Sequence, residues 1–216
     1  RGDYLGNRPS AECSVSGGRD DNNNLGIAIR RGRNMREHVK IMFREEEVNQ
    51  RIQEVADQIN RDYGDTPLHL ICILKGGAMF MCELAKRIHN PLPMPVSFDF
   101  MSVSSYNGTE SSGVVRIVKD LDESLENKHV LIVEDIIDTG RTLAYLIEVL
   151  EKRGPKDIHL CTLLDKPERR VKKQVTVDYV CFTIPDRFVV GYGLDYDQKY
   201  RNYPYIGVVE FEDDKA

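Results

Sequence analysis

Hydrophobic residues recur along this chain at two spacings, which separate helices from strands. After Arg44, four aliphatic residues recur at helical spacing in a charged background, and residues 64–67 (GDTP) end the pattern. This amphipathic stripe predicts a helix of about four turns with one face on the core. The recurring residues are Val48, Ile52, Val55 and Ile59. Residues 78–88 and 141–154 show the same helical pattern.

Short, nearly continuous apolar runs alternate with these helices and predict strands. Residues 68–74 (LHLICIL) and 129–135 (HVLIVED) are typical of strands that are covered on both faces. The other strand-like runs are residues 96–106, 114–120, 157–166, 177–185, 188–193 and 205–211. Helices alternate with strands at first and the last strands follow one another, which predicts an α/β domain with a mainly parallel twisted sheet flanked by helices.

Two polar segments stand outside this pattern. Residues 1–34 mix Gly, Asn, Ser and Arg with few aliphatic residues, which is the composition of a disordered tail. A tag or precursor remnant is an alternative, because the first residue is Arg1. We therefore expect one domain over residues 35–216. The polar, glycine-rich stretch 104–113 predicts a mobile loop.

Composition and charge narrow the class of protein. Hydrophobic content of 41% and charged content of 30% are typical of a globular protein, and no apolar run approaches the roughly 20 residues of a membrane helix. The net charge of -5 disfavours nonspecific binding of nucleic acid. The five cysteines form no C-x-x-C pair and three lie in apolar runs, so we expect reduced, mostly buried thiols and a cytoplasmic location. The histidines show no zinc-ligand spacing.

The stretch VLIVEDIIDTGRTL places Glu134, Asp135 and Asp138 between the end of a buried strand and the start of a helix. Ligands of open α/β sheets bind at such positions. Backbone N–H groups of the turn, with the hydroxyls of Thr139 and Thr142, would form a phosphate cradle. Neighbouring carboxylates can accept hydrogen bonds from sugar hydroxyls or help to hold Mg²⁺. Together these features suggest a site for a ribose phosphate.

A purely structural alternative exists for this stretch. Asp or Thr often caps a helix and Gly permits the preceding turn, so Asp-Thr-Gly could be a cap alone. Three acids at the end of an apolar strand are harder to explain in this way, because carboxylates beside a buried strand are costly without a partner. The glycine patterns of a Walker A loop and of a dinucleotide-binding fingerprint are both absent.

The same stretch resembles the phosphoribosyl-pyrophosphate motif of type I phosphoribosyltransferases. The wider pattern is similar to their 6-oxopurine branch, the hypoxanthine-guanine phosphoribosyltransferases, over about residues 44–211. The other matching motifs, in the family's order, are LKGG (74–77), SSY (104–106), LLDKPERR (163–170) and FVVGYGLDYDQKYRN (188–202). The resemblance implies the type I phosphoribosyltransferase fold, with a small hood formed by the N- and C-terminal segments and a mobile active-site loop.

For the sugar donor, the resemblance implies roles for residues of four motifs. Glu134 and Asp135 would address the ribose hydroxyls. The pyrophosphate would lie at Lys75, Gly76 and Arg201, with an unusual peptide geometry between Lys75 and Gly76. The turn that would hold the 5′-phosphate consists of Asp138, Thr139, Gly140, Arg141 and Thr142. The loop that would close over the reacting centre contains Ser105 and Tyr106.

For the purine and its surroundings, the resemblance implies five further roles. Lys166 would donate to the 6-oxo group, Phe188 would stack on the ring, and Val189 would offer backbone groups to another edge. Asp195 would lie beside this purine site and bind Mg²⁺ on the pyrophosphate. Asp138 would act as the general base at N7, because the attacking purine must lose a proton.

The resemblance also implies a cofactor and substrates. Mg²⁺ would be held by Glu134, Asp135 and Asp195, and would help to neutralise the departing pyrophosphate. The substrates would be phosphoribosyl pyrophosphate and hypoxanthine or guanine, with IMP or GMP and pyrophosphate as products. Xanthine stays open as a third base, since small differences near Val189 could decide for or against it. Members are commonly dimers or tetramers, so we expect a homodimer or homotetramer.

Simpler interpretations remain for several residues. Lys166 could be a solvated lysine at a strand end, Phe188 could be a core residue, and Asp195 could cap a turn. A noncatalytic relative that binds nucleotide or RNA is the alternative for the whole chain. Such a protein would lack Asp138 or Lys166, or carry a basic stripe, and the sequence shows neither.

Overall fold

The computed structural model describes residues 35–88, 96–105, 115–171 and 175–213. All of them belong to the compact unit Met35–Ala216. The expected tail, residues 1–34, lies outside the described residues, as do Tyr106 and most of the expected mobile loop.

A six-stranded sheet forms the centre of the described unit, in the order β4-β3-β2-β5-β6-β7. Neighbouring strands are parallel except for β4, which is antiparallel to β3. The predicted mainly parallel sheet is therefore confirmed. The strands are β2 (Leu68–Leu74), β3 (Ser97–Ser105), β4 (Val115–Lys119), β5 (His129–Ile137), β6 (Asp157–Asp165) and β7 (Tyr179–Thr183).

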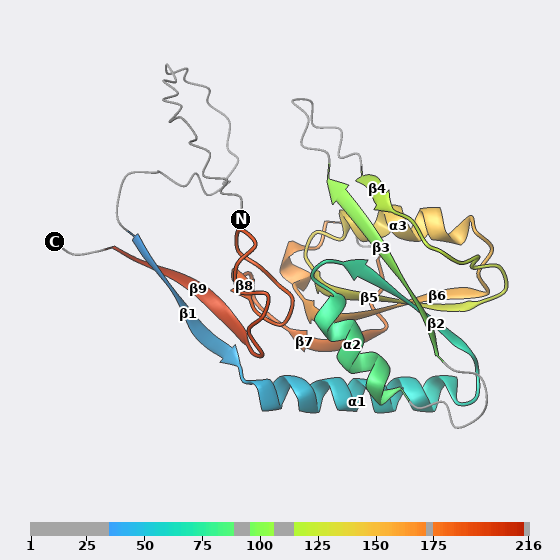
Figure 1. The fold of residues 1–216 in the computed structure, drawn as a ribbon, viewed down its shortest axis with the longest axis horizontal. Helices are drawn as coiled ribbons and strands as arrows, with labels where there is room; N and C mark the ends of the chain where they lie inside the picture. Colours follow the sequence, from blue (N-terminus) through green and yellow to red (C-terminus); the bar gives the residue numbers. More distant parts are fainter. Residues whose placement is uncertain (1–34, 89–95, 106–114, 172–174, 214–216) are drawn as a thin grey trace, which may run out of the picture. The chain divides into compact units, whose positions relative to one another are not determined.

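Helices cover both faces of this sheet. The helices α1 (Glu45–Tyr63) and α2 (Ala78–Arg87) lie on one face, and α3 (Arg141–Glu151) lies on the other (Figure 1). In β2, Leu70 and Cys72 belong to the core under α1 and α2, whereas Ile71 and Ile73 belong to the core under α3. Burial on both faces explains the unbroken apolar run of this strand. In the described part of the chain, no helix is both long and apolar enough to cross a membrane.

The chain reverses its direction of travel across the sheet between β2 and β5. From β2 it proceeds to β3 and β4 on one side, and from β5 it proceeds to β6 and β7 on the other. Ligands of open α/β sheets bind beyond the carboxyl ends of the strands at such a switch point. The LKGG motif lies at the end of β2 and the acidic stretch at the end of β5, so both predicted phosphate sites lie there.

A second, antiparallel sheet of three strands joins the two ends of the described unit. It has the order β1-β9-β8, where β1 is Met35–Phe43, β8 is Val189–Val190 and β9 is Ile206–Asp213. This sheet confirms the hood that the family resemblance implies. The hydrophobic pattern alone predicts no element in residues 35–43. The strand-like run 188–193 contributes only two strand residues, because the backbone turns at Gly191 and Gly193, whose φ angles are 93° and 102°.

Candidate active site

Two acidic residues lie inside β5 rather than after it. The strand runs two residues beyond its predicted end at Asp135, because Ile136 and Ile137 keep pairing with β6. Burial and the neighbouring charge of Asp135 raise the pKa of Glu134 well above its usual value. Burial also raises the pKa of Asp135, although the N–H of Ile136 donates to its carboxylate. Oε2 of Glu134 is buried without a hydrogen-bond partner in the described residues, which is typical of a group that meets a polar ligand.

The turn after β2 packs directly against Asp135. A Cβ atom on Gly76 would lie 1.5 Å from Oδ2 of Asp135, so only glycine fits at this position. The peptide bond between Leu74 and Lys75 is cis. The expected unusual peptide therefore precedes Lys75 instead of following it, and the placement between Lys75 and Gly76 was wrong by one residue.

The loop between β8 and β9 completes this side of the site. A Cβ atom on Gly193 would lie 2.0 Å from the carbonyl oxygen of Gly76, so the two loops touch through their backbones. Arg201 donates to the carbonyl of Gly193 at 2.7 Å and pairs with Oδ1 of Asp195 at 2.7 Å. Both residues are close enough to act on the pKa of Asp135: the positive charge of Arg201 lowers it and the negative charge of Asp195 raises it. The predicted pyrophosphate residues and the candidate Mg²⁺ ligands thus lie together.

The candidate Mg²⁺ ligands do not form a metal cage by themselves. No group of three or more His, Cys, Asp or Glu side chains in the described ranges is arranged to hold a metal ion. Oδ2 of Asp195 accepts from the backbone N–H of Gln198 at 2.7 Å, so Asp195 also closes a turn, as its simpler interpretation predicts. Mg²⁺ usually binds one or two carboxylates together with substrate phosphates. The candidate ligands are all carboxylates, and one oxygen of Glu134 has no hydrogen-bond partner in the described residues. Both features fit Mg²⁺ bound by carboxylates together with substrate phosphates.

The turn after β5 leaves the start of α3 open to an anion. Gly140 is the N-cap residue with a φ of 73°, and no described side chain caps this helix end. The hydroxyl oxygen of Thr139 accepts one long hydrogen bond, of 3.4 Å, from the backbone N–H of Arg141. Thr142 lies in the first turn of the helix. Free N–H groups at a helix N-terminus bind phosphate well, so the geometry suits the predicted 5′-phosphate turn.

Asp138 does not cap α3, contrary to the structural alternative. Its carboxylate instead pairs with Arg169, with Oδ1 2.8 Å from Nε and Oδ2 3.3 Å from Nη2. Nη1 of Arg169 lies 3.3 Å from Asp186, whose other oxygen lies 3.4 Å from Nζ of Lys166. Only 10% of the Lys166 side chain is exposed, so the interpretation of Lys166 as a solvated lysine is wrong. A continuous polar chain therefore joins Asp138 to Lys166.

The loop that carries Lys166 is tied to the phosphate turn through the backbone. The N–H of Lys166 donates to the carbonyl of Ile137 at 3.0 Å, and the N–H of Val171 donates to that of Thr139 at 3.1 Å. Between these bonds lies a short 3-10 helix, Pro167–Arg169. Sequence reasoning placed no role on Arg169, although it lies within the matching LLDKPERR motif.

Phe188 and Val189 lie at the open edge of the hood sheet. The Phe188 side chain is 49% exposed and meets Tyr196 edge-on at 5.4 Å between ring centroids, so its interpretation as a core residue is wrong. Val189 pairs with Val208, and the N–H of Val209 donates to the carbonyl of Phe188. In this antiparallel register, the N–H and C=O of Val189 point away from β9, towards the free edge.

The comparisons with known proteins agree with this geometry. The phosphoribosyl transferase domain family matches residues 38–197. The chain belongs to the phosphoribosyltransferase family. The hypoxanthine-guanine phosphoribosyltransferase of Streptococcus thermophilus is 49% identical over 175 residues, which are 80% of this chain and 94% of that protein.

Two solved structures of hypoxanthine phosphoribosyltransferases are similar to this phosphoribosyltransferase. The hypoxanthine phosphoribosyltransferase of Staphylococcus aureus has 49% identity and a TM-score of 0.73, over 79% of this chain and 91% of that one. The enzyme of Trypanosoma cruzi, solved in complex with the product IMP, has 45% identity and a TM-score of 0.72, over 79% of this chain and 94% of that one.

The predicted closing loop of this phosphoribosyltransferase is only partly described. Ser105 is the last residue of β3 and pairs with Val115 at the start of β4. Tyr106 lies outside the described residues, so the closing role of both residues stays a prediction.

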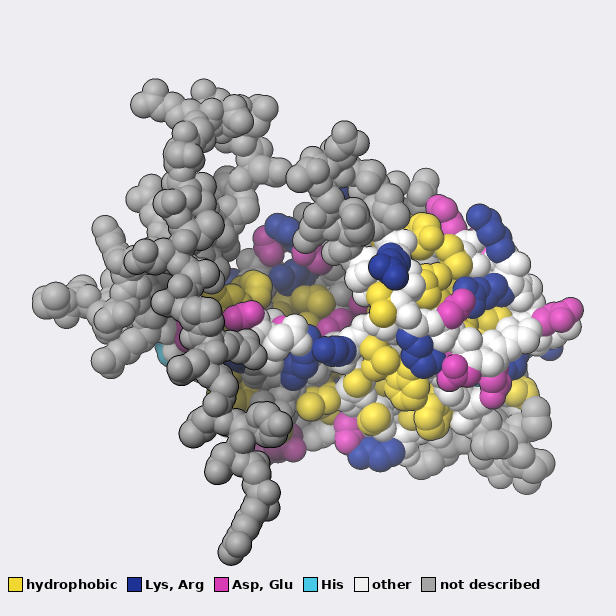
Figure 2. Space-filling view, turned by 45° about the horizontal axis from the view of Figure 1, so that its top comes forward, with side chains coloured by type: hydrophobic (Ala, Val, Ile, Leu, Met, Phe, Trp, Pro, Cys, Tyr) yellow, Lys and Arg dark blue, Asp and Glu magenta, His cyan; other side chains and the backbone are white. Residues whose placement is uncertain are grey.

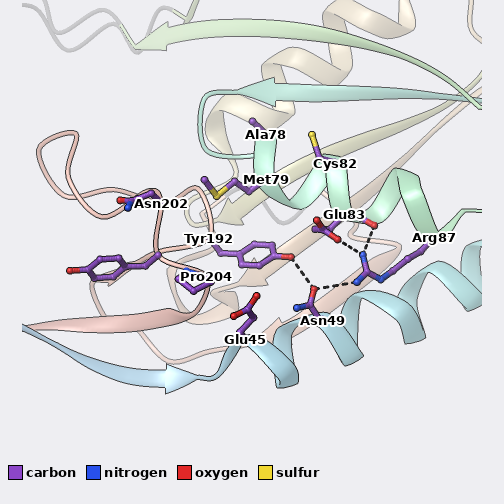
Figure 3. Close-up of a pocket in the computed structure, with 11 residues that line it drawn as sticks. Glu45, Asn49, Ala78, Met79, Cys82, Glu83, Arg87, Tyr192, Asn202 and Pro204 are labelled. Carbon is purple, nitrogen blue, oxygen red and sulfur yellow. Dashed lines mark hydrogen bonds and ion pairs between the residues drawn. The ribbon is translucent and has the colours of Figure 1, made fainter.

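None of the predicted site residues lines a cavity of about 770 Å³ (Figure 3). It lies between the start of α1, the outer side of α2 and the loop after β8. Asn49 links its two walls, since the hydroxyl of Tyr192 lies 3.5 Å and Nη2 of Arg87 lies 3.2 Å from its Oδ1. Met79 and Tyr192 belong to the segments that carry Gly76 and Gly193. The cavity is therefore distinct from the candidate active site of this phosphoribosyltransferase, although its lining belongs in part to neighbouring segments.

The charges on the face shown in Figure 2 do not resemble those of a nucleic-acid-binding protein. On the described residues visible in Figure 2, Lys and Arg side chains are interspersed with Asp, Glu and hydrophobic side chains, without a continuous basic stripe. The net charge of -5 also disfavours nonspecific binding of nucleic acid. The alternative of an RNA-binding relative therefore gains no support from this face.

Proposed function

We propose that this chain is a purine salvage enzyme that transfers the 5-phosphoribosyl group from phosphoribosyl pyrophosphate to N9 of hypoxanthine or guanine. The products are IMP or GMP and pyrophosphate. The observation that carries this proposal is the convergence of four separate motifs at the switch point of the sheet, in a chain 49% identical to an enzyme named for this reaction. Those motifs carry Gly76, Asp138, Lys166 and Val189.

On the donor side, the basic residues hold the leaving pyrophosphate. Lys75 and Arg201 would neutralise its negative charge, which builds up as the bond to the anomeric carbon breaks. Bound Mg²⁺ would supply further neutralisation of that charge, with Asp195 and the Glu134–Asp135 pair as its protein contacts. The contact between Gly76 and Gly193 supports this role, because it fixes the distance between the two loops that bear the charges.

The ribose phosphate lies over β5 and the start of α3. Glu134 and Asp135 would accept hydrogen bonds from the vicinal ribose hydroxyls, which would give the unpartnered oxygen of Glu134 a donor. The phosphate would accept hydrogen bonds from the backbone N–H groups of residues 139–142 and from the hydroxyls of Thr139 and Thr142. Arg141 would add a nearby positive charge. Open backbone donors and the helix dipole together favour a dianion at this position.

On the acceptor side, Asp138 takes the proton from N7 as N9 attacks the anomeric carbon. Lys166 would donate to the 6-oxo oxygen, and the low exposure of this lysine strengthens such a bond because less water competes for it. Phe188 would stack on the ring with its exposed face. The outward N–H and C=O of Val189 would meet the edge of the base that carries C2.

A coupled assay of purified protein tests the whole proposal. The protein is incubated with Mg²⁺, phosphoribosyl pyrophosphate and one base at a time from hypoxanthine, guanine, xanthine and adenine, and pyrophosphate and nucleotide are both measured. We expect equal amounts of both products with hypoxanthine and guanine. Absence of pyrophosphate release with each of the three 6-oxopurines would overturn the catalytic function.

The same panel decides about xanthine. The outward carbonyl of Val189 can accept from the 2-amino group of guanine, but it would repel the 2-oxo group of xanthine. We therefore propose that xanthine reacts more slowly than guanine. An equal kcat/KM for the two bases would contradict this preference.

We further propose a cytoplasmic homodimer or homotetramer in which residues 35–216 are the catalytic domain and residues 1–34 are a tail. The free thiols support a reducing compartment, since Cys72, Cys161 and Cys181 are buried and unpaired. Burial raises the pKa of Cys72 and Cys181 to about 12, which keeps them as unreactive thiols. Light scattering measures the oligomeric state, and a chain shortened to residues 35–216 should retain full activity.

A further inference from the structure

Arg169 forms a bridge between the two groups that face the purine. It contacts Asp138 through Nε and Nη2, at 2.8 and 3.3 Å, and Asp186 through Nη1 at 3.3 Å. The second oxygen of Asp186 lies 3.4 Å from Nζ of Lys166. We propose that Arg169, with Asp186, is a positioning residue that sets the spacing between the base Asp138 and the 6-oxo donor Lys166. This inference rests on the proposed function.

The chemistry of the purine explains why such a bridge is useful. The 6-oxo oxygen and N7 lie on the same edge of the ring, so one donor and one acceptor must meet two neighbouring atoms at once. The two side chains come from different strands, since Asp138 follows β5 and Lys166 follows β6. Neither side chain contacts the other directly in the hydrogen bonds of the described residues, and the bridge is what links them. Small errors in spacing at a reacting centre are costly for rate.

The bridge leaves Asp138 able to act as a base. A carboxylate offers about four acceptor sites, two on each oxygen, and Arg169 uses one on each. Each oxygen of Asp138 therefore keeps a free site for the N7 proton. A planar guanidinium also fixes the plane of the carboxylate, which a single lysine charge does not.

By exposure alone, Arg169 would be an ordinary surface residue. The exposed fraction is 47% for the side chain of Arg169 and 42% for that of Asp138. Exposed ion pairs of this kind add little to stability, so a role in folding does not account for it. Arg153 provides a matched comparison. Its guanidinium forms the same two-bond contact with Asp120, at 2.7 and 3.0 Å, beyond the C-terminal end of α3 and away from the site.

Steady-state kinetics of Arg169→Gln, Arg169→Lys and Arg153→Gln test the proposal, with hypoxanthine and phosphoribosyl pyrophosphate varied separately. We expect Arg169→Gln to lower kcat at least tenfold while the KM for phosphoribosyl pyrophosphate changes less than threefold. Arg169→Lys, which keeps the charge but loses the fork, should recover only part of the loss. Arg153→Gln should match the wild-type protein. Thermal unfolding establishes that each variant is folded.

A double-variant cycle gives a readout that a purely structural role would not produce. If one bridge carries the effect, the loss in kcat for Arg169→Gln with Asp186→Asn should be no greater than about that of the worse single variant. The proposal would be overturned if the two losses multiply in the double variant, or if Arg169→Gln leaves kcat unchanged. It would also be overturned if Arg169→Gln raises the KM for phosphoribosyl pyrophosphate by as large a factor as it lowers kcat. An inactive wild-type protein would instead overturn the proposed function, so the two failures are distinguishable.

Discussion

Gly193 lies so close to Gly76 that a Cβ atom on Gly193 would stand 2.0 Å from the carbonyl oxygen of Gly76. The hood loop and the loop after β2 therefore touch through backbone atoms, with no side chain between them. This contact joins the loop that carries Arg201 to the loop that carries Lys75, and the pyrophosphate is proposed to lie at these two loops.

Gly193→Ala should therefore separate these two loops. We expect at least a tenfold loss in kcat/KM for phosphoribosyl pyrophosphate, because the methyl group has no room against a backbone oxygen. Gly64→Ala is the matched control, since Gly64 also has a positive φ, 52°, but nothing within 4 Å of its Cβ position. The Gly64→Ala variant should lose about 1 kcal/mol of stability through backbone strain, and its activity should be unchanged. Equal activity losses in both variants would remove the steric explanation.

Asp138→Asn should abolish proton transfer and spare the binding of the donor. The amide is similar in shape to the carboxylate but cannot accept the N7 proton, so kcat should fall by about 10²- to 10⁴-fold. The affinity for phosphoribosyl pyrophosphate, measured by calorimetry, should change little. Comparable losses in turnover and in donor affinity would show that Asp138 only binds.

Lys166→Ala should weaken the choice between 6-oxopurines and adenine. Loss of a buried donor to the 6-oxo group should lower kcat/KM for hypoxanthine by about 10- to 100-fold, which corresponds to a charged hydrogen bond of about 1.5–3 kcal/mol. The rate with adenine should not fall in parallel. Lys152→Ala, at an exposed position after α3, is the control. Unchanged discrimination in Lys166→Ala would place Lys166 outside the purine site.

Glu134→Gln should stabilise the ligand-free protein at neutral pH and flatten its pH dependence. Burial raises the pKa of Glu134 well above 4.5, so the folded protein keeps a proton that the unfolded chain has released. Stability is then lost as the pH rises from about 5 through the raised pKa. Glutamine removes this loss, so we expect a higher free energy of unfolding at neutral pH. Urea unfolding at several pH values measures it, and a steeper decline in the variant would contradict the assignment.

The sequence predicted the parts of the fold that depend on local pattern. The helix stripe of Val48 to Ile59 and the apolar run of β2 are both found, because burial of a helix face or of both strand faces leaves a periodic signal. Strand β1 carried no such signal. It is stabilised by pairing with β9, where Val39 meets Val209, and a partner so distant in the chain is invisible to local patterns.

The candidate site was predictable as a set of motifs and not as a set of contacts. The family resemblance named Asp138 and Lys166, but it gave no reason to single out Arg169, which lies between them only after β5 and β6 pair. It also placed the unusual peptide after Lys75, whereas the cis bond precedes that residue. Backbone geometry and ion pairs across strands depend on tertiary structure, so residue identity alone does not determine them.

The proposed sites for the sugar donor and for the purine draw mostly on different parts of the chain. In the proposed function the donor lies on segments that follow β2 and β5, whereas the purine, apart from its contact with Asp138, meets the stretch from the end of β6 to β8. A descendant enzyme could therefore adopt a different nucleobase by replacing residues in that one stretch, while the machinery for the activated sugar stays as it is. Protein engineers who seek new nucleotides from this scaffold should vary residues 165–189 first.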